Sequence, residues 1–390
     1  MATENNNKNL NVPNLRFPEF SGEWDRIKVS DLLEFYPTNS LSWEQLEYSD
    51  EGIFNLHYGL IHKGLPTQVD VSVNSLPTIK EEFIPKKISL CQNGDVAFAD
   101  ASEDTNDVAK CIEFANCEGQ KIVCGLHTIH GRDKQNKTVT GYKGYAFSAR
   151  AFREQIRRLA QGTKIYSISS GNFSECYIGI PSKAEQSKIA NLLLAVDQRI
   201  ATQIKIIEKL ESLIKGLCQK LTQQGDPNTA LNECLVCYSS TLQESSVLEA
   251  GNYPVYGATG ICGYTDTPEV DGDSILIIKD GASVGVTYYA SGEYSAIGTL
   301  NRLIAKGGYS LRYLYYCLKV FNFAPYRTGL AIPHIYFRDY GKAQIWCPPI
   351  EDQNRIASAL EKVEQKIATE KSLLEQLYSQ KRFLLQAMFI

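Results

Sequence analysis

"EQSKIANLLLAVDQRIAT" occupies residues 185–202, and "DQNRIASALEKVEQKIAT" occupies residues 352–369, 167 positions later. Nine of the eighteen positions are identical in the two phrases. Each phrase spaces apolar residues four and three positions apart in turn, which is the a/d pattern of a coiled coil. The repetition predicts two matching long helices.

The apolar seam continues beyond the quoted phrases. Its predicted members are Ile189, Leu193, Val196, Ile200, Ile207 and Leu210 in the first helix, and Ile356, Leu360, Val363, Ile367, Leu374 and Leu377 in the second. A polar residue interrupts both copies at the same place, Gln203 in one and Glu370 in the other. Each helix of about 40 residues would be roughly 60 Å long and could not bury its seam alone. We expect the two helices to pack antiparallel, the alternative being two unrelated amphipathic helices in separate cores.

The ends of the first helix are marked by local signals. Ser182 and Glu185 fit a capping box after Pro181, and Gly225 followed by Pro227 fits a helix end. These signals and the repeat place the helices at 181–224 and 348–390.

The segments before the two helices also share ordered landmarks. "VSDLLEFY" (29–36) resembles "LNECLVCY" (231–238), "NGDVAFADAS" (93–102) resembles "DGDSILIIKDGAS" (271–283), and "CGLHTI" (124–129) resembles "IGTLNR" (297–302). Gly162 and Gly329 match at the helix offset of 167. Short strand-like runs with Gly-rich turns dominate these segments, which predicts a β-rich domain before each helix.

The predicted fold is therefore α+β with an internal pseudo-twofold repeat. Two β-rich mixed domains are separated by two long helices that form an antiparallel coiled coil. The expected order is a flexible N-terminal tail at 1–14, a first domain at 15–180, a first helix at 181–224, a second domain at 225–347 and a second helix at 348–390.

Composition narrows the class of protein. No apolar run approaches the roughly 20 residues of a membrane helix, and the polar start "MATENNNKNLNV" is not a signal peptide, so we expect a cytoplasmic protein without a membrane partner. The eleven cysteines are expected to be reduced. Cys234 and Cys237 form one CxxC, but no second pair or histidine pair accompanies it, so we interpret both as structural. We predict no metal site.

Motifs of enzyme chemistry are missing from the sequence. There is no phosphate loop, GxSxG, HExxH or amino-methyltransferase motif, and the glycines of "YGATGICG" (256–263) are interpreted as turn glycines. A basic stretch precedes each helix instead, at 148–172 and at 311–329, where the second is rich in Tyr and Phe. Arginine and lysine beside aromatic residues favour phosphate contact, although a solvated helix face is the other interpretation, and the net charge of −4 neither predicts nor excludes a nucleic acid.

Taken together, the sequence resembles the specificity subunits of type I restriction–modification systems. The resemblance covers nearly the whole chain and rests on "NLRFPEFSGEW" (14–24), "NGDVAFADAS", "YPVYGATGICGY" (253–264) and the doubled pattern P-x-x-x-E/D-Q-x-x-I-A before a long helix. The motif residues that carry over are Pro181, Gln186, Ile189, Pro348, Gln353 and Ile356, and they belong to the scaffold.

The resemblance implies a non-catalytic DNA specificity subunit. Two target-recognition domains would each read one half of a gapped, asymmetric site in double-stranded DNA. Two modification subunits, which methylate adenine at N6, would dock on the helices, and two restriction subunits would complete the complex. No cofactor is expected in this chain, whereas S-adenosylmethionine, ATP and Mg are implied for the partners.

Loops able to enter the major groove are the candidate DNA contacts. In the first domain they carry His57, His62, Lys63, His127, Arg132 and the segment from Lys164 to Asn172, and in the second they carry Lys279, Ser283, Asn301, Arg302, Arg327, His334 and Arg338. We expect Lys63, Lys279 and Arg327 to contact phosphates. We expect His127, Asn301 and His334 to lie nearer the bases.

Two other functions remain open on the sequence alone. One is a self-contained DNA methyltransferase or nuclease with a cryptic site. The other is a coiled-coil scaffold with no role on DNA.

Overall fold

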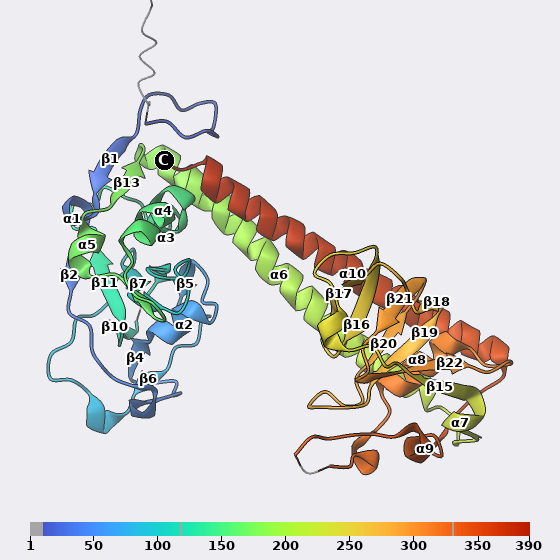
Figure 1. Cartoon of the computed structure of the whole chain (residues 1–390). Helices are drawn as coiled ribbons and strands as arrows, with labels where there is room; N and C mark the ends of the chain where they lie inside the picture. Colours follow the sequence, from blue (N-terminus) through green and yellow to red (C-terminus); the bar gives the residue numbers. More distant parts are fainter. Residues whose placement is uncertain (1–10, 118, 330) are drawn as a thin grey trace, which may run out of the picture. The chain divides into compact units, whose positions relative to one another are not determined.

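A computed structural model describes residues 11–117, 119–329 and 331–390 (Figure 1). It divides into two compact units, Met1–Gln203 with Leu374–Ile390 and Ile204–Leu373. We call them unit 1 and unit 2. The expected N-terminal tail lies outside the described residues up to position 10. From Asn11 the chain is anchored, because the Trp24 N–H donates to the Asn11 carbonyl at 2.8 Å and the Leu15 N–H donates to the Ala387 carbonyl at 2.8 Å.

Unit 1 is built on two sheets. The five-stranded sheet has the order β2 (Glu34–Tyr36), β11 (Thr128–Arg132), β7 (Val96–Ala99), β9 (Cys111–Asn116) and β5 (Gln68–Asp70). The four-stranded sheet has the order β10 (Lys121–Cys124), β4 (Ile53–Leu56), β6 (Thr78–Ile79) and β3 (Leu46–Glu47). Two small antiparallel pairs join β1 (Asp25–Lys28) to β13 (Tyr177–Ile180) and β12 (Tyr166–Ser167) to β8 (Ala101–Ser102). The short helices are α1 (Val29–Leu32), α2 (Tyr58–His62), α3 (Tyr142–Ser148), α4 (Arg150–Leu159) and α5 (Ser170–Ser174), with 3-10 turns at Trp43–Gln45 and Glu81–Phe83.

Unit 2 repeats this plan with fewer residues. Its first sheet has the order β15 (Leu235–Ser239), β22 (Leu300–Ala305), β19 (Ser274–Ile278) and β20 (Thr287–Ala290). Its second has the order β17 (Gly260–Thr265), β16 (Tyr253–Gly257), β21 (Glu293–Ala296) and β18 (Val270–Asp271). A small antiparallel pair joins β14 (Thr229–Ala230) to β23 (Gln344–Ile345). The short helices are α7 (Leu231–Cys234), α8 (Leu311–Lys319) and α9 (Phe337–Tyr340), with 3-10 turns at Glu244–Ser246 and Ala324–Tyr326.

Strand register tests the alignment of the two repeats. His130 of β11 lies opposite both Tyr36 and Ala97, and Arg302 of β22 lies opposite both Tyr238 and Leu276. The predicted match of 29–36 with 231–238 agrees with this register. The match of 124–129 with 297–302 is wrong by one residue in its strand part, because it pairs Ile129 rather than His130 with Arg302. Unit 1 has one extra residue between its loop glycine and its strand, and such a slip exchanges the two faces of a strand.

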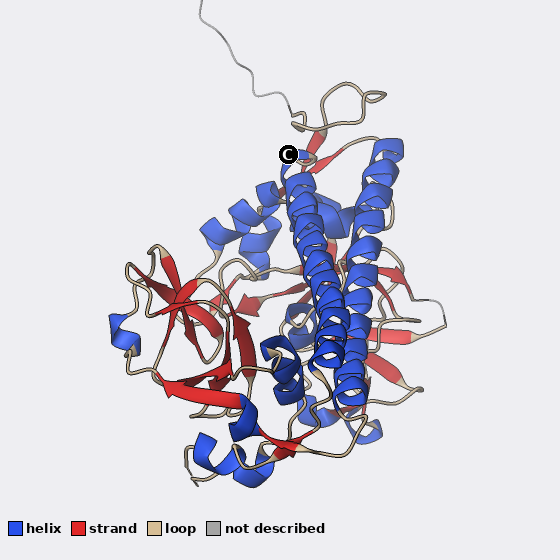
Figure 2. Cartoon of the chain, turned by 90° about the vertical axis from the view of Figure 1, so that its right-hand side faces the viewer, coloured by secondary structure: helices blue, strands red, loops and turns tan. Residues whose placement is uncertain are grey.

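The long helices are α6 (Lys183–Thr222) and α10 (Ile350–Ala387), which pack on each other within each unit (Figures 1 and 2). In unit 2, Glu211 pairs with Lys371 at 2.6 Å. Cys218, two turns later in α6, lines the same pocket as Glu364, two turns earlier in α10. The two helices therefore run antiparallel, and the predicted fold class is confirmed. Among the described residues, none of the helices is long and apolar enough to cross a membrane.

Most predicted seam side chains are buried. Those below a tenth exposed are Ile189, Leu193, Val196, Ile200, Ile207, Ile356, Leu360, Ile367 and Leu377, whereas Leu210, Val363 and Leu374 are half-buried. The polar positions Gln203 and Glu370 are buried as well, at 6% and 8% exposed. Lys381, a charged residue at a seam position, pairs with Asp197 at 2.6 Å and lies over the ring of Tyr145.

The start of α6 differs from the expected capping box. The Glu185 N–H donates to Ser182 Oγ at 3.3 Å, which is half of the box. The Glu185 carboxylate accepts from Arg16 Nε and Nη2 at 2.7 Å each. The side chain is therefore used to tie the chain before the first strand to the helix.

Equivalent hydrogen bonds attach each unit to its helices. The Gln186 side chain donates to the Pro181 carbonyl at 2.8 Å and accepts from the Val139 N–H at 2.9 Å. Gln353 does the same with the Pro348 carbonyl at 2.8 Å and the Ser310 N–H at 3.0 Å. The glutamine of the doubled motif is therefore needed at this position because its side chain both donates to and accepts from the backbone.

Two tyrosines per unit make a second matched set. Tyr145 donates to Asp197 at 2.9 Å, and Tyr316 donates to Glu364 at 2.8 Å. Tyr142 and Tyr313 donate to the carbonyls of Gly179 and Trp346, at 2.7 and 2.6 Å. The repeat is thus present at the level of single side-chain hydrogen bonds.

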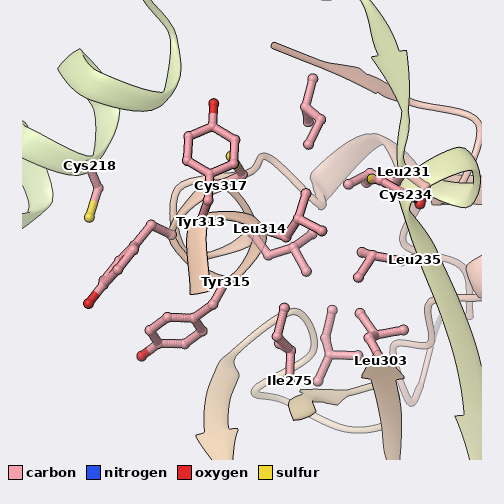
Figure 3. Close-up of a cluster of buried hydrophobic side chains, with 14 of the residues drawn as sticks. Cys218, Leu231, Cys234, Leu235, Ile275, Leu303, Tyr313, Leu314, Tyr315 and Cys317 are labelled. Carbon is pink, nitrogen blue, oxygen red and sulfur yellow. Dashed lines mark hydrogen bonds between the residues drawn. The ribbon is translucent and has the colours of Figure 1, made fainter. Parts of the chain in front are cut away.

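The core of unit 2 joins its sheet to the helices (Figure 3). Tyr313, Leu314 and Cys317 of α8 lie between Cys218 of α6 and strand residues such as Leu303. Cys234 of the CxxC is fully buried in this core, and Cys237 is partly buried against it. Both cysteines therefore serve as apolar packing residues in this core.

Candidate nucleic-acid interface

One pocket in unit 1 gathers several predicted DNA contacts. It has a volume of about 650 Å³ and is lined by His57, His62, Lys63 and His127 among others. Trp43, Tyr58 and Ile165 add apolar surface, and Asp104 and Asp107 add acidic groups. The helix α2 contributes because it begins directly after His57, whose Nδ1 accepts from the Gly59 N–H at 3.1 Å.

His57 is held inside the unit. It is 3% exposed, and its ring centre lies 4.5 Å from the ring centre of Trp43 and 4.7 Å from that of Tyr58. Burial, with smaller contributions from His127 and Lys63, lowers the pKa of His57. The ring is therefore a neutral support for the pocket wall. His62 Nε2 lies 2.9 Å from the Ala101 carbonyl, while Lys63 is exposed.

His127 is the exposed histidine of the same pocket. Its side chain is 50% exposed, and Nδ1 lies 3.1 Å from Asp100 Oδ1. Its backbone adopts a left-handed conformation with φ of 54°. Left-handed backbone is uncommon for a residue with a side chain and is often found at functional positions. The loop before β11 thus presents an exposed imidazole.

A matched hairpin borders the candidate surface in each unit. Gln161 and Ser167 exchange backbone hydrogen bonds at 2.9 and 2.8 Å, as do Thr328 and His334. Gly162 and Gly329 have positive φ, and a Cβ at either would strike the carbonyl oxygen three residues later. The predicted match of these glycines thus corresponds to one tight turn built twice.

Unit 2 builds its exposed corner from other residues. His334 Nδ1 lies 2.7 Å from Asp280 Oδ1, and the ring of His334 stacks on that of Tyr336. The Arg338 guanidinium lies over the Tyr336 ring, 4.9 Å from the ring centre, and the Arg338 side chain is 79% exposed. Lys279 directly follows β19, lies one residue before Asp280 and is half-buried.

Other predicted contacts of unit 2 lie on neighbouring loops. Ser283 is exposed three residues after Asp280. Arg327 is exposed and donates to the Val284 carbonyl at 3.1 Å. Arg302 is half-buried and lies over the Tyr238 ring at 4.6 Å.

Two further predicted contacts make internal bonds. Arg132 binds both carboxylate oxygens of Asp95 at 2.7 Å and is 18% exposed. Hydrogen bonds from Arg132 and His130 outweigh burial and lower the pKa of Asp95. Asn301 is 5% exposed and accepts from Ser239 at 2.9 Å. Like His57, Arg132 and Asn301 make contacts inside the unit, and we do not propose them as DNA contacts. In the first hairpin Lys164 is exposed, whereas Asn172 is half-buried in α5.

Several cations of the basic stretches make contacts within the fold, although Arg157 and Arg158 are exposed. Arg153 is half-buried and donates to the Asn106 carbonyl, and Arg150 pairs with Glu154 at 2.6 Å. In unit 2, Arg312 pairs with Glu361 at 3.0 Å and Lys319 with Glu364 at 2.5 Å. Both acids belong to α10, so these cations attach the unit to its helix. The sequence could not show this, because the acids lie about 50 residues away.

Sequence reasoning also missed exposed residues at the hairpin tips. Ile165 is 63% exposed and Ile332, at the same offset of 167, is 58% exposed. Tyr336 and Trp43 are 45% and 40% exposed. The sequence does carry one signal for them, because an isoleucine stands three residues after the turn glycine in both repeats. Exposed apolar and aromatic groups beside histidines and cations can stack on bases, contact thymine methyl groups or pair with base edges.

Comparison with known proteins places this geometry in a family. The model of the type I restriction modification DNA specificity domain matches residues 68–212 and 238–379. A putative type I restriction enzyme specificity subunit of Haemophilus influenzae is 28% identical over 121 residues, covering 30% of this chain and 31% of that protein. The type I restriction enzyme EcoprrI specificity subunit of Escherichia coli is 27% identical over 110 residues, covering 28% and 27%. The chain thus spans less than a third of either curated relative.

Solved structures extend the likeness to the whole fold. The S subunit of a type I restriction–modification system from M. genitalium has a TM-score of 0.61 and 19% identity, covering 97% of this chain and 99% of that one. A chain from a study of complex assembly and conformational transition of the type I R-M system has a TM-score of 0.57 and 16% identity, covering 93% and 96%. Specificity subunits are the non-catalytic members of such systems. With one match of the family model over each repeat, the chain belongs to the type I restriction–modification DNA specificity family.

Proposed function

We propose that this chain selects the DNA sequence for a type I restriction–modification complex. The first β-rich domain, at 15–180, reads one half of a gapped, asymmetric site, and the second, at 225–347, reads the other. The observation that carries this proposal is a duplicated scaffold with unlike loops. Gln186 and Gln353 make the same bonds, whereas the histidine of each exposed corner comes from a different segment.

Side chains at the two corners are assigned to DNA by their exposure and chemistry. His127 and His334 each have one ring nitrogen beside an aspartate, which orients the ring and leaves its other edge for a base. Lys63, Lys164, Arg327 and Arg338 are exposed cations around these rings and suit phosphate oxygens. We also assign Lys279 and Ser283 to the second corner.

The long helices carry the proposed contact with two modification subunits, with two restriction subunits completing the complex. Apolar side chains outside the seam support this assignment, since Ile206 and Leu213 of α6 are 38% and 50% exposed. Tyr378 and Phe383 of α10 are 39% and 59% exposed. Exposed apolar groups along a helix are typical of a surface covered by a partner. In this proposal the partners hold S-adenosylmethionine, ATP and Mg.

A domain exchange tests the proposal. We expect replacement of 225–347 by the corresponding segment of another family member to change one half of the methylated motif and leave the other half intact. Motif sequencing of DNA from cells that also express the modification subunit gives the readout. The matched control exchanges 15–180 and should change only the opposite half. A change in both halves, or in neither, would contradict one domain per half-site.

A further inference from the structure

We propose that Cys91, Cys124 and His130 form a zinc-binding site in the core of unit 1. One ligand atom from each residue lies within 4.8 Å of the other two. The two Sγ atoms are 3.6 Å apart. In a tetrahedral site with Zn–S bonds of about 2.3 Å, two sulfurs lie about 3.8 Å apart, so the pair already has nearly the required separation. The three residues are 6%, 1% and 0% exposed.

The hydrogen bonds of His130 prepare one ring nitrogen for a metal. Nε2 lies 2.8 Å from Asp95 Oδ2, and Asp95 is itself fixed by both bonds from Arg132 and by the Gln92 N–H at 2.8 Å. A carboxylate accepts, so Nε2 carries the proton and Nδ1 keeps its lone pair. Nδ1 is buried and has no hydrogen-bond partner among the described residues. Histidine ligands of metals commonly donate their other N–H to a carboxylate in this way.

The donor set selects the metal. Two thiolates and one imidazole suit Zn²⁺, whereas magnesium and calcium prefer oxygen ligands. Binding would release one proton from each thiol to solvent, so that two thiolates balance the charge of the ion. The fourth position falls to water, as in zinc sites with three protein ligands.

The proposed ion would join both sheets of unit 1. Cys124 ends β10 of the four-stranded sheet, and His130 lies in β11 of the five-stranded sheet. The loop between them carries His127. Zinc would therefore fix the base of that loop. Unit 2 has Ile297 and Arg302 at the matching positions, so the inference concerns unit 1 alone and holds whether or not the chain reads DNA.

No sequence pattern indicates this cluster. Its ligands come from three separated segments with intervals of 33 and 6 residues, which resemble none of the usual zinc spacings. Only the pairing of strands brings them together, as when the Cys91 N–H donates to the Ile122 carbonyl at 2.8 Å.

Metal analysis of the purified full chain tests the proposal. After expression with zinc, elemental mass spectrometry should find about one zinc per chain. Cys91→Ser, Cys124→Ser and His130→Ala should each reduce that content several-fold. Cys176→Ser is the matched control, because Cys176 is equally buried in unit 1 and lies outside the cluster, and it should keep the zinc.

Cobalt provides a second readout that needs no variant to fold. Adding Co²⁺ to metal-free wild-type chain should produce thiolate-to-cobalt absorption and the visible bands of a tetrahedral ion, and one equivalent of Zn²⁺ should abolish both. Absence of zinc together with absence of these bands would overturn the proposal. So would an intact mass showing a Cys91–Cys124 disulfide in the freshly purified chain.

Discussion

The two units use the same hydrogen bonds where they meet the helices and different residues where their loops end. Tyr145 and Tyr316 both donate to an acid of α6 or α10, at residues 197 and 364. At the exposed corners, His127 comes from the loop before β11, whereas His334 comes from a hairpin end. The two repeats thus share their attachment to the helices, whereas their loops differ. A chain with matched platforms and unlike loops can present one kind of partner surface twice and two different surfaces for DNA.

The seam offers the largest expected effect within this comparison. Val196→Asp should lower the free energy of unfolding by several kcal/mol, because Val196 is 5% exposed and the carboxylate would be buried without a partner. Val363→Asp, at the matching position, should cost less because Val363 is half-buried. Urea unfolding of the purified chains measures both.

The control for the seam is Ala195→Asp, which adds the same charge at the neighbouring exposed position. It should leave the unfolding midpoint nearly unchanged. Equal losses from Val196→Asp and Ala195→Asp would show that the seam does not support the fold.

A smaller effect is expected at the matched glutamines. Gln186→Ala and Gln353→Ala each remove the partner of a backbone N–H, that of Val139 or Ser310, and of a proline carbonyl. Leaving such buried groups unpaired costs about 1–3 kcal/mol. We expect similar losses in the two variants, measured by thermal unfolding.

Gln198→Ala and Gln365→Ala are the matched controls, since both glutamines are exposed and lie at the same offset of 167. They should be nearly neutral. A large loss at only one of the two buried glutamines would break the equivalence of the two attachments.

The helices were predictable because their signal is local and repeated. Apolar residues at coiled-coil spacing can be recognised without knowing the rest of the fold. The constant offset of 167 residues then aligns Ile189 with Ile356. The strand alignment was harder to predict. Side chains alternate between the two faces of a strand, so the one extra residue before β11 moves every aligned side chain to the opposite face. Domain boundaries and DNA contacts remain predictions.

The exposed corners could be predicted only in part. The repeat predicts both His127 and His334 at loop tips. Each lies beside an aspartate, but His127 is exposed and His334 is half-buried. Arg132 and Asn301 stood in similar contexts but face internal partners, Asp95 and Ser239. Whether a polar side chain points outward depends on contacts across strands distant in sequence. No local pattern encodes that.

The loops should separate base reading from general affinity. His127→Ala removes a ring edge from the first corner, and we expect a loss of about 1–3 kcal/mol on the preferred DNA together with relaxed choice at one position. His334→Ala should do the same in the other half-site. Methylation motifs of the two variants give the readout. Relaxation in the same half from both variants would contradict the assignment of one corner to each half-site.

The smallest expected effect lies at Lys164, which is exposed in the first hairpin. A lysine that contacts a phosphate releases about one counterion on binding, so Lys164→Ala should lower the slope of log affinity against log salt by about one. The loss should be equal for all DNA sequences, because a phosphate carries no base identity. Affinities of the assembled complex for specific and unrelated duplexes, measured across salt concentrations, provide the test. Lys183→Ala is the control, since Lys183 is an exposed lysine of the same unit at the start of α6. An unchanged slope in Lys164→Ala, or a loss of affinity confined to one DNA sequence, would show that the hairpin does not contact the DNA backbone. The proposed DNA contact of unit 1 would then rest on the corner around His127 alone.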